Sequence, residues 1–314
     1  MKIAIIDSTV YRCLLSKNTA HVINKAGLNK KDIKLNYHGT LVVNTIYKYI
    51  NENLHIDVYN ICNSIKGNSD VLIAALEDLI YDNDVKIILI CAVINRIDVE
   101  PIEKLLKRLY EKGKIIIVSS SNKGVHSYPA ISKYVIGVGR GAFLGKNEFS
   151  IDYQSEIQIT GDVMPEFIKL NNNRYRIFSG TSKAVPKVLG YILEAYSHGA
   201  GKLNEILDYI SVYASENHYD IDNFQYSIEE AADREFIDRV LNIANCSGFL
   251  RGELMDGKTN ILCELKNIAD ADLLYQYINK RLTINLDISK LTYFDFYTIE
   301  SYCYWMEKNI DKYG

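Results

Sequence analysis

Several features that would classify a protein at once are missing from this sequence. No apolar run approaches the roughly 18 residues that a membrane-spanning helix needs. The six cysteines are scattered without a Cys-x-x-Cys pair, which excludes a small disulfide-stapled scaffold and predicts that the thiols stay reduced. The sequence contains no internal repeat and no low-complexity tract. A net charge of -3 gives no electrostatic reason to expect binding to nucleic acid or to an anionic membrane.

The spacing of the side chains also gives no indication of a metal or a cofactor. Five of the six histidines lack a partner residue at the two- or four-residue spacing of metal ligands, and no acidic loop is specific enough for a calcium site. The 24 tyrosines are more simply explained by composition and packing, and several of them lie in the C-terminal part of the chain without the interleaved basic residues that binding of single-stranded nucleic acid requires. We therefore expect no cofactor, no metal site and no nucleic-acid partner.

What is present is typical of a globular protein. The 314 residues allow one large domain or two unequal ones, and a composition of 48% hydrophobic and 24% charged residues indicates a real core. Residues 1–7 already show a strand pattern, with one lysine and an apolar run too short for a signal peptide. We therefore predict a fold that begins at residue 1, no export signal and a cytoplasmic location.

Short apolar runs alternate with helical patterns over the first two-thirds of the chain. Strands are predicted at residues 2–6, 55–61, 86–91, 114–119 and 134–138. Helices are predicted at residues 40–51, 70–81, 101–111 and 182–197. Several strands are continuous apolar runs, which indicates burial on both faces of a parallel sheet. The alternation predicts an α/β fold with a doubly wound, mostly parallel sheet.

The character of the sequence changes near residue 225. Residues 226–314 contain 15 acidic side chains against 10 basic ones. Their periodicity is helical at residues 235–245, 269–281 and 297–309. We predict two domains, a larger α/β domain at residues 1–225 and a small acidic helical module at residues 226–314.

Three short segments carry residue types that work together in nucleophilic catalysis. Asp7 ends the first strand, His38 begins His-Gly-Thr-Leu-Val at the start of a helical pattern, and Ser182 lies in Ser-Gly-Thr-Ser-Lys-Ala-Val-Pro ahead of another. Each of them alone is more often a turn, loop or cap residue. Together, in the order Asp, His, Ser with gaps of 31 and 144 residues, they resemble the subtilisin-like serine proteases over about residues 1–200. A fourth match is Asn122, in Ser-Asn-Lys-Gly, at the place where that family carries its oxyanion-hole asparagine.

The resemblance implies a subtilisin-like fold and a role for each of these residues. His38 would take the proton of the Ser182 hydroxyl, and Asp7 would hold the imidazole in the right tautomer and stabilise the imidazolium. The backbone N–H of Ser182, at the start of a helix, and the side-chain amide of Asn122 would stabilise the oxyanion.

The match departs from the family pattern near the substrate channel. A segment that usually reads Ser-Leu-Gly corresponds here to a stretch that includes Cys91, Ala92 and Val93, and Ser121 replaces the usual glycine before the asparagine. We expect these four residues to contact the substrate and to narrow the specificity pocket. Lys183 follows the nucleophile where an apolar residue is common.

The C-terminal module faintly resembles an acyl- or peptidyl-carrier-protein domain. Its acidic balance and helical segments carry the resemblance, which aligns Ile268 with the serine that holds the phosphopantetheine arm. Isoleucine has no hydroxyl, so the resemblance implies a module that has lost its prosthetic group and serves recognition or docking to a protein partner. The alternative is a plain helical extension of the protease domain.

The leading hypothesis is a cytoplasmic serine endopeptidase of narrow specificity that cleaves a peptide or protein substrate through an acyl-enzyme on Ser182. Maturation of a specific, modified precursor peptide would suit such specificity, although this role rests on analogy. A transpeptidase or macrocyclase would use the same triad, with an amine in place of water. The alternative from another class is a non-catalytic peptide-binding scaffold.

Overall fold

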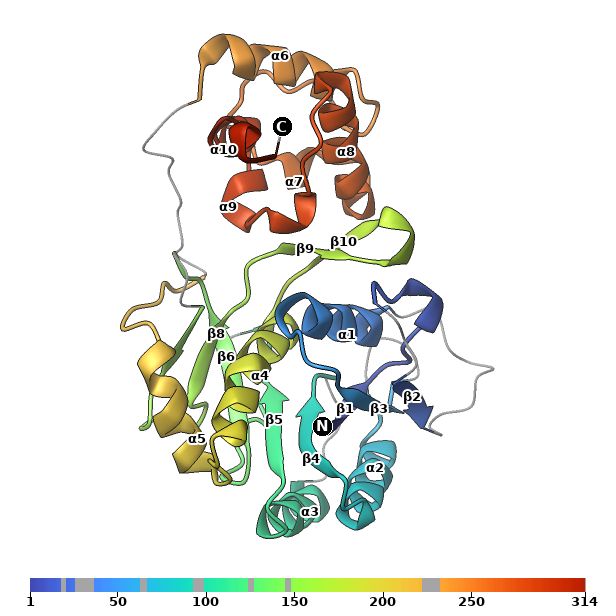
Figure 1. Cartoon of the computed structure of the whole chain (residues 1–314), viewed down its shortest axis with the longest axis vertical. Coiled ribbons are helices and arrows are strands. Elements are labelled where there is room, and N and C mark those ends of the chain that lie inside the picture. The colour runs from blue at the N-terminus through green and yellow to red at the C-terminus, as the bar shows by residue number, and fades with distance from the viewer. Residues whose placement is uncertain are drawn as a thin grey trace. The chain divides into compact units, whose positions relative to one another are not determined.

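The computed structural model describes residues 1–17, 21–25, 37–62, 67–92, 99–123, 127–144, 148–221 and 232–313. The chain forms two compact units (Figure 1). The first comprises Met1–Met164 and Ser179–Phe224, and the second comprises Pro165–Phe178 and Gln225–Gly314. Among the described residues, no helix has the length and apolar character needed to cross a membrane.

Eight strands form one sheet in the first unit. They are β1 (Lys2–Asp7), β2 (Val22–Lys25), β3 (His55–Asn60), β4 (Val85–Ile90), β5 (Ile115–Ser119), β6 (Ile136–Gly141), β7 (Phe149–Ile151) and β8 (Ile159–Asp162). Their order across the sheet is β2-β3-β1-β4-β5-β6-β8-β7, and every neighbouring pair is parallel except β7 and β8. The predicted α/β fold with a mostly parallel sheet is confirmed.

Helices cover both faces of this sheet. They are α1 (His38–Tyr49), α2 (Ser69–Tyr81), α3 (Val99–Glu111), α4 (Thr181–Ser197) and α5 (Leu203–Ile210). Strand side chains alternate between the two faces, and Ala4 and Ile6 of β1 pack into one core with α2 and α3. The intervening Ile3, Ile5 and Asp7 therefore face the other side of the sheet, where α1 and α4 pack against each other.

The strand order reverses beside β1. From β1 the chain builds β2 and β3 on one side of it and then crosses to β4 on the other side. In open α/β sheets, ligands bind outside the carboxyl ends of the strands at such a switch point. Asp7 at the end of β1 and Cys91 just after β4 both lie there, and the Cys91 N–H donates to the carbonyl oxygen of Ile6 at 3.1 Å.

The second unit combines helices with a β-hairpin. Its elements are β9 (Glu166–Lys169), β10 (Tyr175–Phe178), α6 (Arg234–Asn245), α7 (Ile261–Glu264), α8 (Ala271–Leu282), α9 (Tyr293–Phe296) and α10 (Ile299–Tyr313). The helical segments predicted near residues 235–245, 269–281 and 297–309 correspond to α6, α8 and α10. Phe167 of the hairpin is fully buried in the same core as Tyr275 and Phe296.

The two units differ from the predicted domains, divided at residue 225, mainly in where the β9–β10 hairpin belongs. That division placed residues 165–178 in the larger domain, whereas the structure places them in the second unit. Two kinds of contact hold them there. Phe167 and Tyr175 contribute to the core of the second unit, and Arg174 forms a two-point ion pair with the buried Asp272 at the start of α8, with contacts of 2.8 and 3.3 Å.

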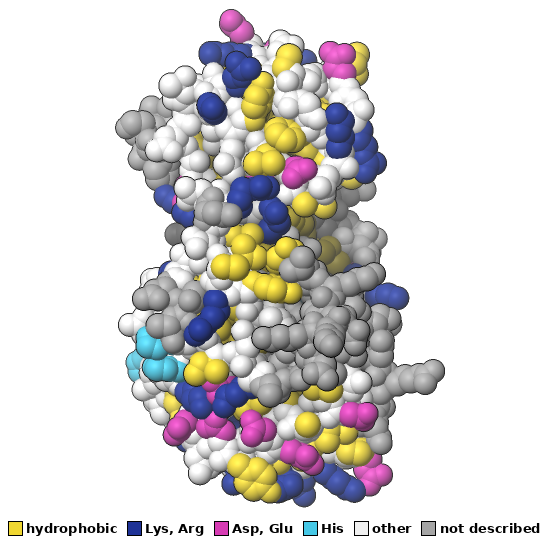
Figure 2. Space-filling view, turned by 90° about the vertical axis from the view of Figure 1, so that its right-hand side faces the viewer, with side chains coloured by type: hydrophobic (Ala, Val, Ile, Leu, Met, Phe, Trp, Pro, Cys, Tyr) yellow, Lys and Arg dark blue, Asp and Glu magenta, His cyan; other side chains and the backbone are white. Residues whose placement is uncertain are grey.

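Charges of both signs lie together on the surface. At the amino ends of the strands, Lys2 Nζ is 3.1 Å from an Asp57 carboxylate oxygen and 2.7 Å from one of Asp82. On the lower part of the face shown in Figure 2, basic and acidic side chains are interleaved. This distribution agrees with the small net charge of the chain.

Candidate active site

Asp7 and His38 form a close pair at the carboxyl edge of the sheet. Asp7 is fully buried, and its two carboxylate oxygens lie 2.9 and 2.8 Å from Nδ1 of His38. The Ser8 N–H donates to the same carboxylate at 2.5 Å. A hydrogen bond from Nδ1 to this carboxylate leaves Nε2 of His38 as the nitrogen that can accept a proton.

The start of α1 is brought against β1 by a glycine. A Cβ atom on Gly39 would lie 2.4 Å from the carbonyl oxygen of Ser8, and the Gly39 N–H donates to the Ser8 hydroxyl at 2.8 Å. Thr40 accepts a hydrogen bond from the Tyr11 N–H at 3.0 Å. These contacts fix the first turn of the helix, and therefore His38, beside the loop that follows Asp7.

The neighbouring carboxylate changes the acidity of His38. Burial alone lowers the pKa of the imidazole, but the charge of Asp7 and the hydrogen bond to it outweigh burial, so the pKa lies above the ordinary value of 6.5. The side chain of His38 is 35% exposed, so its ring can be reached from solvent.

Ser182 lies in the first turn of α4, which begins after a glycine with a positive φ angle. Gly180 has a φ of +90°, and a Cβ atom there would lie 2.8 Å from the amide of Asn122. The Ser182 hydroxyl is nearly buried and donates to the carbonyl oxygen of Cys91 at 2.9 Å. Since Cys91 is hydrogen-bonded to β1 one residue before Asp7, this contact brings Ser182 to the same edge as the Asp7–His38 pair.

Asn122 follows β5 and is anchored through its side-chain oxygen. Its Oδ1 accepts from the N–H of Thr181 at 2.8 Å and lies 3.1 Å from the Thr181 hydroxyl oxygen. The single proton of that hydroxyl is donated to the nearer acceptor, the carbonyl oxygen of Ser120 at 2.7 Å. With Oδ1 occupied in this way, the amide nitrogen of Asn122 is the group left to donate elsewhere, beside the start of α4.

Of the four residues predicted to contact substrate, the structure describes Cys91, Ala92 and Ser121. Cys91 is buried, Ala92 is half-buried, and Ser121 is half-buried with its N–H bound to the Ser127 hydroxyl at 2.8 Å. Val93 lies outside the described residues. Burial raises the pKa of the Cys91 thiol well above its ordinary value, and the charge of Asp7 adds to this effect, so the thiol stays protonated. The group of Cys91 that accepts the hydrogen bond from the Ser182 hydroxyl is its main-chain carbonyl oxygen.

A buried charged cluster behind the serine was not expected from the sequence. Lys183 is fully buried, and its Nζ lies 2.7 Å from a carboxylate oxygen of Asp162 at the end of β8. Lys187, one helical turn later, lies 3.3 Å from the same oxygen and also pairs with Glu148. The sequence signal was Lys183 itself, at a position where an apolar residue is common. Its partner Asp162 lies on β8, a strand that the sequence pattern did not predict.

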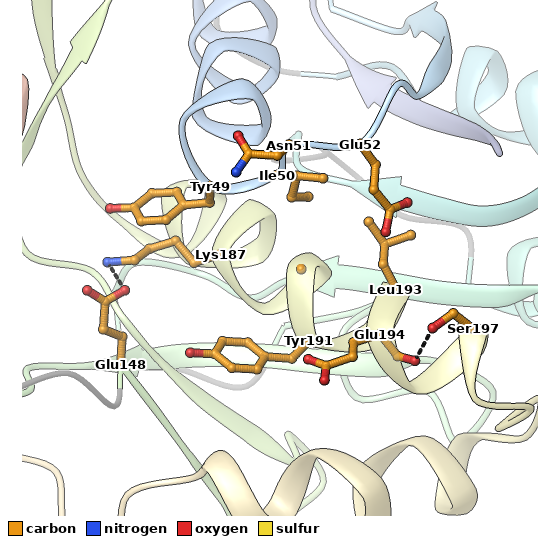
Figure 3. A pocket seen from close by; sticks show the side chains of 11 residues that line it. Tyr49, Ile50, Asn51, Glu52, Glu148, Lys187, Tyr191, Leu193, Glu194 and Ser197 are labelled. Carbon is orange, nitrogen blue, oxygen red and sulfur yellow. Dashed lines mark hydrogen bonds and ion pairs between the residues drawn. The ribbon is translucent and has the colours of Figure 1, made fainter.

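A cavity of about 580 Å³ lies beside the end of α1 and the later turns of α4. It is lined by aromatic and acidic side chains, among them Tyr49, Tyr191, Glu52 and Glu194. Figure 3 shows Lys187 at one end of it, paired with Glu148 and beneath the ring of Tyr49. None of the predicted catalytic residues lines this cavity.

Among the described residues, no group of three or more His, Cys, Asp or Glu side chains could hold a metal ion.

Comparisons with known proteins identify the fold. No protein-family model matches the sequence, and no curated protein matches it. Among solved structures, the chain is similar to a cold-adapted subtilisin-like serine proteinase, with a TM-score of 0.54 and 15% identity over 73% of this chain and 89% of that one. It is also similar to the prenylagaramide maturation protease PagA, with a TM-score of 0.51 and 18% identity over 88% of this chain and 94% of that one. The chain therefore has a subtilisin-like fold.

The predicted likeness of the C-terminal module to a carrier protein stays a prediction. Ile268 is 55% exposed in the short turn that precedes α8. A second cavity, of about 510 Å³, lies within the second unit between the hairpin and α8, and Tyr175, Phe249 and Gln276 are among the residues that line it.

Proposed function

We propose that the protein is a serine endopeptidase that uses Asp7, His38 and Ser182 as its catalytic triad and Asn122 as an oxyanion-hole donor. The observation that carries this proposal is the Asp7–His38 pair, in which a fully buried carboxylate meets Nδ1 of a half-exposed imidazole at 2.8 Å. A buried carboxylate in this position selects the tautomer whose Nε2 is a base, which is the arrangement that activates a serine. The subtilisin-like fold adds support, because it has this chemistry in one of the similar structures.

The proposed reaction begins with a movement of the Ser182 hydroxyl. Its hydrogen bond to Cys91 must be exchanged for one to Nε2 of His38, which takes the proton as Oγ attacks the substrate carbonyl. The oxyanion would be stabilised by the Ser182 N–H and the amide nitrogen of Asn122. The imidazolium then protonates the leaving amine, and water, activated by His38, releases the acid and regenerates Ser182.

The resting contact of Ser182 supports a narrow substrate range. The Cys91 carbonyl that accepts the hydrogen bond of the Ser182 hydroxyl belongs to a buried residue just after β4, at the carboxyl edge of the sheet, where we propose that the main-chain N–H groups of an extended peptide bind. A substrate that occupies this carbonyl would displace the hydroxyl towards His38. We propose a peptide or protein substrate that is recognised in this way. Maturation of a precursor peptide is the role we favour, supported by the similarity to the maturation protease PagA, and we place this role in the cytoplasm.

The test is covalent labelling with a fluorophosphonate probe, read by intact mass. We expect one adduct on the native protein and none on Ser182→Ala or His38→Ala. His198→Ala is the matched control, because His198 is an exposed histidine at the end of α4, and it should be labelled like the native protein. An absence of any adduct on the native protein would contradict the proposal and favour the non-catalytic scaffold.

The two enzyme classes that share this triad differ in their products. Hydrolysis adds the mass of one water to the sum of the fragments, whereas a transpeptidase or macrocyclase joins the acyl group to an amine. Both need the same acyl-enzyme, so product mass rather than labelling distinguishes them. We favour hydrolysis, because the side chain of His38 is 35% exposed and water can therefore reach the acyl-enzyme.

We further propose that the second unit holds the protein or peptide partner. Its support is the cavity of about 510 Å³ between the hairpin and α8, which combines aromatic rings with side-chain amides. Such a lining offers apolar contact together with hydrogen bonds to a peptide backbone.

A further inference from the structure

The buried ammonium group of Lys183 lies directly behind the nucleophile. Its Nζ donates to Oδ2 of Asp162 at 2.7 Å and to the carbonyl oxygen of Met164 at 2.6 Å. A charge removed from water is costly unless it is paired and hydrogen-bonded, so these contacts account for a lysine at a site with no exposed surface. They also join the start of α4 to the end of β8.

The end of β8 is itself tightly defined. The second carboxylate oxygen of Asp162 accepts from the Met164 N–H at 3.2 Å, and the Val163 carbonyl accepts from the Gly180 N–H at 2.9 Å. Gly161 allows the strand to approach α4 closely, because a Cβ atom there would lie 2.7 Å from that of Ala184. The segment 161–164 and the turn that carries Ser182 therefore form one hydrogen-bonded structure.

This segment is also the point at which the chain passes between units. The chain leaves the first unit at Met164 and returns at Ser179, three residues before the nucleophile. Lys183 thus binds the last residue before the hairpin of the second unit. A displacement of Met164 would be transmitted to the first turn of α4 through this lysine.

We propose that Lys183 is a positioning residue for Ser182, which it holds in place by fixing the first turn of α4 to Asp162 and Met164. The inference rests on the proposed role of Ser182 as nucleophile. Lys183 does not touch the reacting atoms, and its effect is on where the serine hydroxyl and N–H lie.

Lys183→Met tests this role, because methionine keeps the length of the side chain and removes the ammonium. Asp162 keeps Lys187 at 3.3 Å, so the variant does not leave a carboxylate without a cation. Asp162→Asn is the second variant, which retains an acceptor oxygen for Lys183. The matched control is Lys114→Met. Lys114 is also buried and binds two carbonyl oxygens, at 2.5 and 2.7 Å, but these lie at the opposite, amino edge of the sheet.

Two measurements are made on the full chain. The first is the rate constant for fluorophosphonate labelling across pH, and the second is hydrogen exchange of the backbone amides at residues 180–184. We expect Lys183→Met to label about 10- to 100-fold more slowly, the loss that a misplaced reacting group produces, with an unchanged apparent pKa because the His38–Asp7 pair is intact. We expect faster exchange at residues 180–184, changes in the same direction in both readouts for Asp162→Asn, and native values for Lys114→Met.

Native labelling and native exchange in Lys183→Met would overturn the inference. So would slower labelling without faster exchange, since Lys183 would then act on the chemistry rather than on position, and so would equal effects in Lys114→Met. If the native protein takes no label, the proposed function fails, and the exchange of residues 180–184 alone decides the role of Lys183.

Discussion

At the scale of single residues, the Asp7–His38 pair makes stability and activity depend on pH in opposite ways. The pKa of folded His38 lies above its ordinary value of 6.5 because the charge of Asp7 and their hydrogen bond outweigh burial. The charged pair therefore stabilises the fold fully below the unfolded pKa, and this contribution is lost as pH rises through the folded pKa. The proposed base is the neutral imidazole. The rate of the proposed reaction therefore rises over the same pH range in which the ion pair ceases to stabilise the fold.

We predict that the labelling rate of Ser182 rises with pH along a single titration whose apparent pKa lies above 6.5. Asp7→Asn should move this apparent pKa down, because the charge that raises it is gone, and should slow labelling about 10⁴-fold, as expected when the imidazole is held in the wrong tautomer. Rate profiles from pH 5 to 9 measure both effects. Asp152→Asn, in an exposed turn, is the control and should keep the native profile. An unchanged midpoint in Asp7→Asn would show that Asp7 does not set the acidity of His38.

The sequence points to candidate residues for the site but not to their surroundings. The order of Asp7, His38 and Ser182 predicts a catalytic site, and this assignment stays a prediction. The role of Lys183 could not be predicted, because a buried lysine is acceptable only where a carboxylate meets it, and Asp162 reaches it from a strand distant in the sequence. The resting contact of Ser182 with a main-chain carbonyl is equally invisible, since it depends on the path of the backbone and not on a residue type.

At the scale of elements, the start of α4 depends on a conformation that only glycine adopts easily. Gly180 combines a φ of +90° and a ψ of 178° with a contact that leaves no room for a side chain, 2.8 Å from the amide of Asn122. This region of backbone space costs about 1 to 3 kcal/mol for other residues. The glycine therefore sets both the direction of the helix and the position of the Asn122 amide.

Gly180→Ala should lower the free energy of unfolding by about 1 to 3 kcal/mol and slow Ser182 labelling about 100-fold, because the new methyl group pushes Asn122 away from its place. Thermal unfolding and the labelling rate measure the two effects. Gly113→Ala separates crowding from backbone strain, since Gly113 has a φ of +73° but nothing within 4 Å of a new Cβ atom. That control should lose stability while labelling at the native rate. Equal labelling of both variants would contradict the argument.

Elements were predictable where their side chains show a regular pattern. The apolar runs in β1, β4 and β5 gave the positions of these strands to within a few residues, since strands buried on both faces have no polar side to break the run. Short strands such as β7, of three residues, are too brief for any period to be recognised. The hairpin of β9 and β10 was missed for a different reason: Phe167 and Tyr175 are buried by helices that follow in the sequence about 100 residues later.

At the scale of the whole molecule, the two units share one polypeptide in a way that a simple boundary does not describe. The second unit takes its hairpin from the middle of the chain, immediately before the segment that carries Ser182. Phe167 lies 4.7 Å from Phe296 between ring centroids, and the Tyr175 hydroxyl donates to Asp287 at 3.2 Å. The C-terminal helices are therefore needed to cover a part of the chain that lies within the proposed protease domain.

We predict that a chain ending at residue 221 exposes this hairpin and self-associates. Fully burying a side chain such as Phe167 is worth about 2 to 3 kcal/mol, and without its core that apolar surface meets water or another copy. A second variant of the same length would also replace residues 165–178 by a short glycine-serine turn. The ends are close enough for this, because Glu166 and Phe178 are cross-strand partners in the antiparallel pair.

Size-exclusion chromatography and binding of an apolar dye compare the two shortened chains with the full protein. We expect the chain ending at residue 221 to bind dye and elute as aggregates, and the variant without the hairpin to elute as a monomer with the circular dichroism of an α/β fold. A monomeric, dye-free chain with the hairpin present would show that residues 165–178 do not need the C-terminal helices. Association in both shortened chains would instead show that the first unit needs the second for reasons beyond the hairpin. The first result would assign the hairpin to the first unit, whereas the expected result would show that residues 165–178 fold as part of the second unit.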